Sequence, residues 1–163
     1  MFFLVLWVLG LLTAGGQLFM GGITNFSLSE ICNVLLLHQF VVTFGFVGVI
    51  GLVVNIIRAD QTAEMLGWPG GLFQIKYGFS QIGLGIMGVM AIWFKGNFWV
   101  GTLVTMYIYG ISGLWSHCVV YKEKKEETGK SDIDSIANII MDVAYQTFIT
   151  VLSILAGGIW VFN

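Results

Sequence analysis

Hydrophobic residues fill long stretches of the chain, and short polar segments separate these stretches. A membrane-spanning helix needs about 20 mostly apolar residues. Five stretches meet this requirement, namely residues 1–23, 31–57, 72–94, 98–120 and 136–162. The pattern therefore predicts an all-α fold, a polytopic transmembrane helix bundle with five membrane-spanning helices. We expect residues 1–163 to form a single transmembrane domain.

The connecting segments carry helix-stopping or charged residues. TNFSLSE follows the first apolar stretch, RADQTAEMLGWPGG the second and KGN the third. Pro69 and the glycines beside it prevent one helix from continuing through the second connection. The run YKEKKEETGKSDID separates the last two stretches, and its dense mixed charge predicts a solvated loop.

The basic residues predict how the bundle is oriented. Short cytoplasmic loops of membrane proteins carry an excess of lysine and arginine. Most basic residues fall in the second and fourth connections: Arg58, Lys122, Lys124, Lys125 and Lys130. Of the loop residues, only Lys95 lies on the other side. We expect a multi-pass protein of the cell membrane with a cytoplasmic N-terminus and a C-terminus outside.

The composition agrees with this setting. Hydrophobic residues make up 57% of the chain, charged residues 10%, and the formal net charge is −2. Such a chain lacks the basic face that nucleic-acid binding needs, so we expect membrane lipid and no nucleic acid as its surroundings. Cys32 and Cys118 fall near opposite faces of the bilayer, too far apart for a disulfide, and we expect two free thiols.

Polar residues repeat every three or four positions along the predicted helices, which places them on one face of each helix. In a bilayer such a face is costly unless it points into the bundle. The stripe on the last helix comprises Ser135, Asn138, Asp142, Gln146, Thr150 and Ser153. The stripe on the fourth helix comprises Thr102, Thr105, Tyr109, Ser112 and Ser116. Glycines on the second and third helices favour close helix packing.

Four polar residues from four helices fall within one or two turns of the cytoplasmic surface, counting about 1.5 Å of rise per residue. They are Asn55, Lys76, His117 and Asp142. We expect Asp142 to form an ion pair with Lys76, either as a structural clamp or as the lining of a site open to the cytoplasm. The predicted ligand-binding residues are Lys76, His117, Asp142, Asn55, Asn138, Tyr77 and Gln74.

Catalytic and metal-binding patterns are missing from the sequence. No nucleophile has a base nearby in sequence, and no phosphate-binding loop is present. His38 and His117 fall near opposite faces, about 15 Å apart along the membrane normal, too far to hold one haem iron. We therefore predict a protein that is not an enzyme, with no catalytic residues, no metal ligands and no cofactor.

The stretches ADQTAEMLGWP, FQIKYGFSQIGLGIMGVMAIWFKGNFW and WSH resemble an uncharacterised family of small polytopic membrane proteins of bacteria and archaea. The resemblance covers roughly the central half of the chain. It implies that the following are family positions: Asp60, Gly67, Trp68, Pro69, Phe73, Gln74 and His117. The chain departs from the family pattern at Lys76, where the family tends to have glutamate, and at Asn55, where it tends to have histidine. The resemblance supports the architecture and assigns no function.

Two functions follow most directly from these patterns. The first is binding or transport of a small polar or anionic molecule through the cytoplasmic-side cluster of Lys76, His117 and Asp142. The alternative is a structural or accessory subunit, homo-oligomeric or part of a larger membrane complex, whose glycine stripes and aromatic faces are assembly surfaces. A membrane enzyme acting on lipid or quinone has only His117 and Asp142 in its favour and ranks last.

Overall fold

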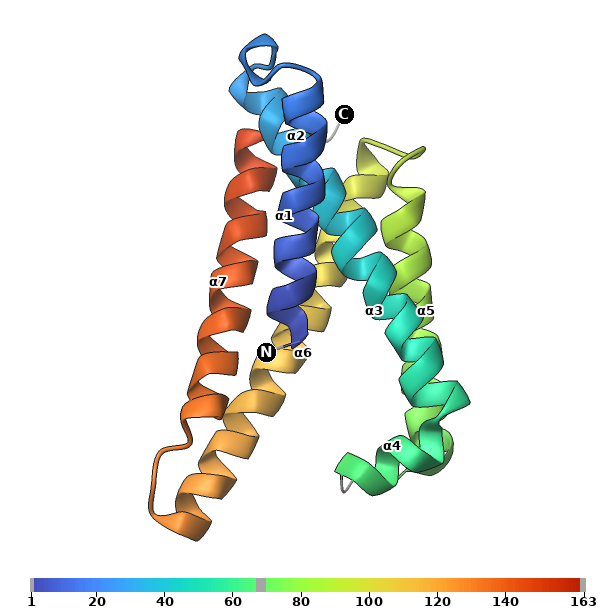
Figure 1. The fold of residues 1–163 in the computed structure, drawn as a ribbon, viewed down its shortest axis with the longest axis vertical. Coiled ribbons are helices and arrows are strands. Elements are labelled where there is room, and N and C mark those ends of the chain that lie inside the picture. Colours follow the sequence, from blue (N-terminus) through green and yellow to red (C-terminus); the bar gives the residue numbers. More distant parts are fainter. Residues whose placement is uncertain (1, 67–69, 162–163) are drawn as a thin grey trace.

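In the computed structural model of the protein, residues 2–66 and 70–161 are described, and every regular element within them is a helix (Figure 1). The longer helices are α1 (Phe2–Met20), α2 (Leu28–His38), α3 (Gly45–Leu52), α4 (Ala59–Leu66), α5 (Gly71–Met90), α6 (Asn97–Thr128) and α7 (Ile133–Leu155). Short helical turns are η1 (Ile23–Asn25), η2 (Gln39–Phe44) and η3 (Val53–Ile57). The predicted all-α helix bundle is thus confirmed.

Helices α2 and α3, with the two π-helical turns η2 and η3, form one continuous helical segment over Leu28–Ile57. It begins three residues before the predicted boundary because Ser27 caps it. The Ser27 side chain accepts a hydrogen bond from the Glu30 amide, and the Glu30 carboxylate accepts one from the Ser27 amide. This reciprocal pair satisfies two amides that a helix start otherwise leaves unpaired.

The charged run after the fourth apolar stretch was predicted to be a loop, and this prediction is wrong for most of its length. Helix α6 continues through the run to Thr128, and Gly129 ends it with a left-handed backbone at φ 67°. The charged side chains do not oppose the helix, because lysine and glutamate are good helix formers. Helix α7 in turn ends at Leu155, where Gly157 and Gly158 have positive φ.

The second connection contains a helix that the sequence did not predict. Helix α4 follows directly after η3 and carries Asp60 in its first turn. Gly67, Trp68 and Pro69, which carry part of the family resemblance, lie outside the described residues. The predicted stop is therefore placed only by its neighbours, the end of α4 at Leu66 and the start of α5 at Gly71.

Within the described residues, four helical segments are long and apolar enough to cross a membrane. They are Phe3–Met20, Leu28–Ile57, Asn97–Thr128 and Ile133–Leu155. Helix α5 is not among these segments, and it carries the polar residues Gln74, Lys76 and Gln81. These helices are compatible with a membrane protein, and the fifth span remains a prediction.

The helices form two arms that diverge toward one end of the molecule (Figure 1). Helix α3 packs along α5 in one arm, and α6 packs along α7 in the other. Helix α4 and the α6–α7 connection lie at the lower end of Figure 1, while the α1–α2 and α5–α6 connections and the last turn of α7 lie at the upper end. This alternation of ends matches the predicted order of the connections.

Glycines bring α5 against the second span at backbone distance. A Cβ atom at Gly48 would lie 2.8 Å from Gly85 Cα, and one at Gly88 would lie 2.2 Å from the Phe40 carbonyl oxygen. Contact this close requires hydrogen in place of a side chain on both helices. These glycine faces therefore pack on each other within the chain.

A cluster of large apolar side chains lies where α2, η2, α6 and α7 meet. Phe40 packs edge-on against Trp99 with ring centroids 5.3 Å apart, and both side chains are buried. Leu36, Leu103 and Ile149 in the same cluster are fully buried. The arms are thus closed at the upper end and separate toward the lower end.

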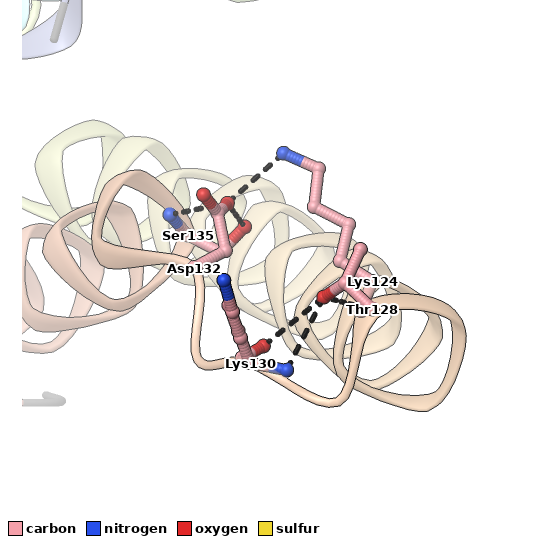
Figure 2. A network of polar contacts seen from close by, with 5 residues as sticks. All are labelled: Lys124, Thr128, Lys130, Asp132 and Ser135. Atoms are coloured by element: carbon pink, nitrogen blue, oxygen red, sulfur yellow. Dashed lines mark hydrogen bonds and ion pairs between the residues drawn. The ribbon is translucent and has the colours of Figure 1, made fainter.

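Hydrogen bonds order the connection between α6 and α7 (Figure 2). Asp132 caps α7 by accepting from the Ser135 amide at 3.1 Å, and its carboxylate also accepts from the Ser135 hydroxyl. Lys124 Nζ of α6 lies 2.9 Å from the same carboxylate oxygen. The Thr128 hydroxyl meanwhile accepts from the Lys130 amide at 3.3 Å. The two helices are therefore joined by a short, hydrogen-bonded turn.

This network predicts a pH response of the turn. The Ser135 hydroxyl, and after it Lys124, lower the pKa of Asp132 below its ordinary value. A carboxyl with a lowered pKa stabilises the folded state fully above its unfolded pKa of about 3.9, and this contribution is lost as pH falls through the lowered pKa. In an NMR titration we expect the Asp132 carboxyl to titrate below pH about 3.9. Ser135→Ala should move its midpoint upward, whereas an unmoved midpoint would contradict the assigned cause.

Candidate ligand-binding cavity

A cavity of about 750 Å³ lies between the two arms. Its wall is formed by the first turns of α1, by η2 and α3, and by the facing parts of α5, α6 and α7. Five of the seven predicted ligand-binding residues line it: Gln74, Tyr77, His117, Asn138 and Asp142. This volume lies within the range of about 300–1,000 Å³ that is typical of small-molecule sites. The sequence prediction thus found residues from three helices that share one cavity.

A close contact between a histidine and a carboxylate in the wall joins α6 to α7. His117 Nδ1 lies 2.7 Å from Asp142 Oδ2, and the side chains are 38% and 16% exposed. A carboxylate at this distance accepts the Nδ1 proton and orients the ring. The pair therefore presents a carboxylate and an oriented imidazole ring to the cavity.

The predicted ion pair between Lys76 and Asp142 is wrong. Asp142 is paired with His117, while Lys76 lies on the exposed face of α5 and is not part of the cavity wall. The helix explains the difference, because Gln74 and Gln81 face inward and Lys76 lies about 200° around α5 from Gln74. The sequence prediction thus placed Lys76 correctly near the start of α5 and wrongly on the inner face of this helix.

Asn55 is buried behind the wall rather than in it. Its amide nitrogen donates to Gln81 Oε1 at 2.6 Å, and its Oδ1 accepts from Gln74 Nε2 at 3.4 Å. Gln81 Nε2 in turn donates a hydrogen bond to the Tyr109 hydroxyl at 3.0 Å. The Tyr77 hydroxyl also donates to Tyr109, at 3.4 Å. This network ties η3, α5 and α6 together and orients the glutamines and tyrosines that face the cavity.

Further polar residues line the cavity that the site prediction did not include: Gln81, Tyr109, Ser112, Ser116 and Gln146. Tyr109, Ser112, Ser116 and Gln146 belong to the polar stripes of the fourth and last predicted helices, so helical periodicity was the signal for them. The apolar members Phe3, Leu6 and Phe44 have no such signal. Apolar residues at a cavity cannot be distinguished by periodicity from those that face lipid or core.

The wall determines what the cavity can do chemically. Polar groups occupy a strip formed by α5, α6 and α7, and apolar side chains from α1, η2 and α3 cover the remainder. Such a cavity suits a molecule with an apolar body and one polar region. Within the described residues, no three histidine, cysteine, aspartate or glutamate side chains are grouped to hold a metal ion.

These features define an all-helical protein whose apolar helices are long enough to cross a membrane and enclose a partly polar cavity. The model of a family of unknown function, DUF6790, matches residues 1–158. The chain belongs to this family. The match extends the resemblance seen in the central half of the sequence to nearly the whole chain. Neither the comparison with curated proteins nor the comparison with solved structures gave a match.

Proposed function

We propose that this protein is a five-span integral membrane protein that binds a small amphipathic molecule in the cavity between its arms, without catalysing a reaction on it. The observation that carries the proposal is the His117–Asp142 pair in the wall of a cavity of about 750 Å³. Ionisable groups within spanning helices are costly and are retained mainly where they serve a site or a partner. Here the two groups meet at a cavity large enough for a ligand.

The distribution of basic residues supports a cytoplasmic orientation for the cavity. Arg58 lies between η3 and α4, and Lys122, Lys124, Lys125 and Lys130 lie in the last turns of α6 and the connection after it. Figure 1 shows α4 and the α6–α7 connection at its lower end, toward which the arms diverge. By the positive-inside rule this end faces the cytoplasm, with the N-terminus inside and the C-terminus outside. Helix α5, which packs along the second span, would then be the fifth spanning helix.

Binding is favoured over transport through the bundle. The cluster around Phe40, Trp99 and Leu103 lies between the cavity and the upper end and is fully or almost fully buried. A route through the molecule would have to cross this close-packed layer. The alternative of a structural or accessory subunit rested mainly on glycine faces as assembly surfaces. Gly48, Gly85 and Gly88 instead pack within the chain, so these faces do not support that alternative.

A cavity-filling substitution tests the proposal. Gly113 lines the cavity, and a Cβ atom there would meet only Asp142 Oδ2, at 3.9 Å. Gly113→Leu should therefore occupy part of the cavity beside Asp142 and lower the affinity for the neutral fluorescent probe N-phenylnaphthylamine at least about tenfold, which corresponds to about 1.4 kcal/mol. The measurement is saturable probe fluorescence in nanodiscs after subtraction of empty nanodiscs.

Gly101→Leu is the matched control. Gly101 is on the same helix and is exposed, and a Cβ atom there would meet no neighbouring atom within 4 Å. Its probe affinity should equal that of the unsubstituted protein. If the unsubstituted protein shows no saturable binding, or if the two variants behave alike, the proposed function is wrong.

A further inference from the structure

We propose that the ligand of this cavity is an organic cation, an amine or quaternary ammonium compound with an apolar body. This inference rests on the proposed binding function and names the chemical class of its ligand. It differs from the sequence prediction of a polar or anionic molecule, because that prediction depended on Lys76. Charge, unpaired oxygen atoms and aromatic side chains of the wall all point to the same class.

The first observation is the charge of the wall. Asp142 is its one carboxylate among the described residues, and none of the seven lysines and arginines of the chain lines the cavity. Among side chains with a permanent charge at neutral pH, the wall therefore has one carboxylate and no lysine or arginine. An anion in the cavity would face Asp142 with no lysine or arginine in the wall to pair with, and this is unfavourable at low dielectric. A cation would instead pair with the carboxylate.

The second observation concerns hydrogen-bond acceptors without partners. Gln74 Oε1 and Gln146 Oε1 are buried and accept no hydrogen bond in the described structure, and both residues line the cavity. Gln74 as a whole is only 5% exposed. A buried unpaired oxygen is costly, so a rotation of either side chain that turned its oxygen into the cavity would be favourable when a bound molecule supplies a donor. After such a rotation these oxygens, together with Asp142, would offer acceptors to an N–H-bearing or positively charged group.

The third observation is the aromatic content of the wall. Six aromatic residues line the cavity, namely Phe3, Phe44, Phe73, Tyr77, Tyr109 and Tyr145. The face of an aromatic ring attracts a cation through its quadrupole, and the attraction grows when water is excluded. An aromatic enclosure with one carboxylate is therefore suited to a cation that carries apolar groups.

A pair of isosteric ions provides the test. Tetraphenylphosphonium and tetraphenylborate have almost the same shape and opposite charge. We expect nanodiscs of phosphatidylcholine containing the unsubstituted protein to bind tetraphenylphosphonium saturably in equilibrium dialysis, and to bind tetraphenylborate no more than empty nanodiscs do. This comparison needs no variant and so does not depend on the folding of one.

Asp142→Asn tests the role of the carboxylate. It keeps the shape of the side chain and should weaken tetraphenylphosphonium binding at least about tenfold, as expected for loss of a charge-assisted contact. Asp134→Asn is the control, because Asp134 is an exposed acid on the same helix outside the cavity wall. It should leave the affinity unchanged.

The outcomes separate the ligand class from the proposed function. Saturable binding of the neutral probe together with equal binding of both tetraphenyl ions would overturn the cation proposal and leave the binding function standing. Unchanged tetraphenylphosphonium affinity in an Asp142→Asn variant that still binds the neutral probe would do the same. Failure of both the neutral probe and the cation to bind would overturn the two proposals together.

Discussion

Gly88→Ala is expected to lower the melting temperature of the purified protein by on the order of 5–10 °C. The added methyl carbon would lie 2.2 Å from the Phe40 carbonyl oxygen and 3.0 Å from Phe44 Cβ. Phe40 and Phe44 belong to the buried cluster, and the nearest atom is backbone, so no side-chain rotation can relieve the overlap. Helix α5 would have to move away from η2.

Gly83→Ala on the same helix provides the control. Gly83 is exposed, and no heavy atom lies within 4 Å of a Cβ position there. Alanine is favoured over glycine in a helix by up to about 1 kcal/mol, so this variant should melt at or slightly above the temperature of the unsubstituted protein. Equal melting temperatures for the two variants would contradict the close backbone packing of α5 on the second span.

The comparison of sequence and structure shows which features periodicity can predict. The stripe that includes Asn138, Asp142 and Gln146 was correctly assigned to the inner face of α7, where all three residues line the cavity. This inference is strong for a spanning helix, because a polar side chain facing lipid is costly and therefore faces the bundle interior or a water-filled cavity. The glycines predicted to pack the second apolar stretch against the third likewise form a helix contact, between α3 and α5.

Helix ends were predicted less well, since caps determine them and hydropathy does not. Ser27 and Asp132 start helices earlier than the apolar pattern indicates, and both are recognisable as capping residues. The extension of α6 to Thr128 follows from helix-forming charged residues that a hydropathy argument assigns to a loop. Local chemistry present in the sequence would have corrected each boundary.

The partner of Asp142 could not be chosen from the sequence. Lys76 and His117 fall at similar predicted depths, and depth does not specify which faces of neighbouring helices meet. The geometry depends on how α6 packs along α7, which brings His117 to 2.7 Å from the carboxylate. Long-range packing of this kind has no local signal, and it changes the expected ligand from an anion to a cation.

The central claim is that a water-accessible cavity with the His117–Asp142 pair in its wall lies between the arms, and thiol accessibility tests it most directly. Ser112 lines the cavity on α6, while its neighbour Ile111 at nearly the same depth is exposed on the outer surface and is not part of the wall. Cysteine at each position can be compared in a Cys118→Ser background, since Cys118 is exposed and Cys32 is buried. The reagent is a membrane-impermeant trimethylammonium methanethiosulfonate, applied to the protein in nanodiscs.

Only a thiolate reacts, and a thiol in apolar surroundings ionises poorly. We therefore expect Ser112→Cys to react on the order of 100-fold faster than Ile111→Cys, since apolar burial shifts ionisation by units of pKa. Adding tetraphenylphosphonium should slow only the reaction at Ser112→Cys. Equal and slow modification of both cysteines would show that no water-filled cavity lies between the arms, and would contradict the proposed binding function.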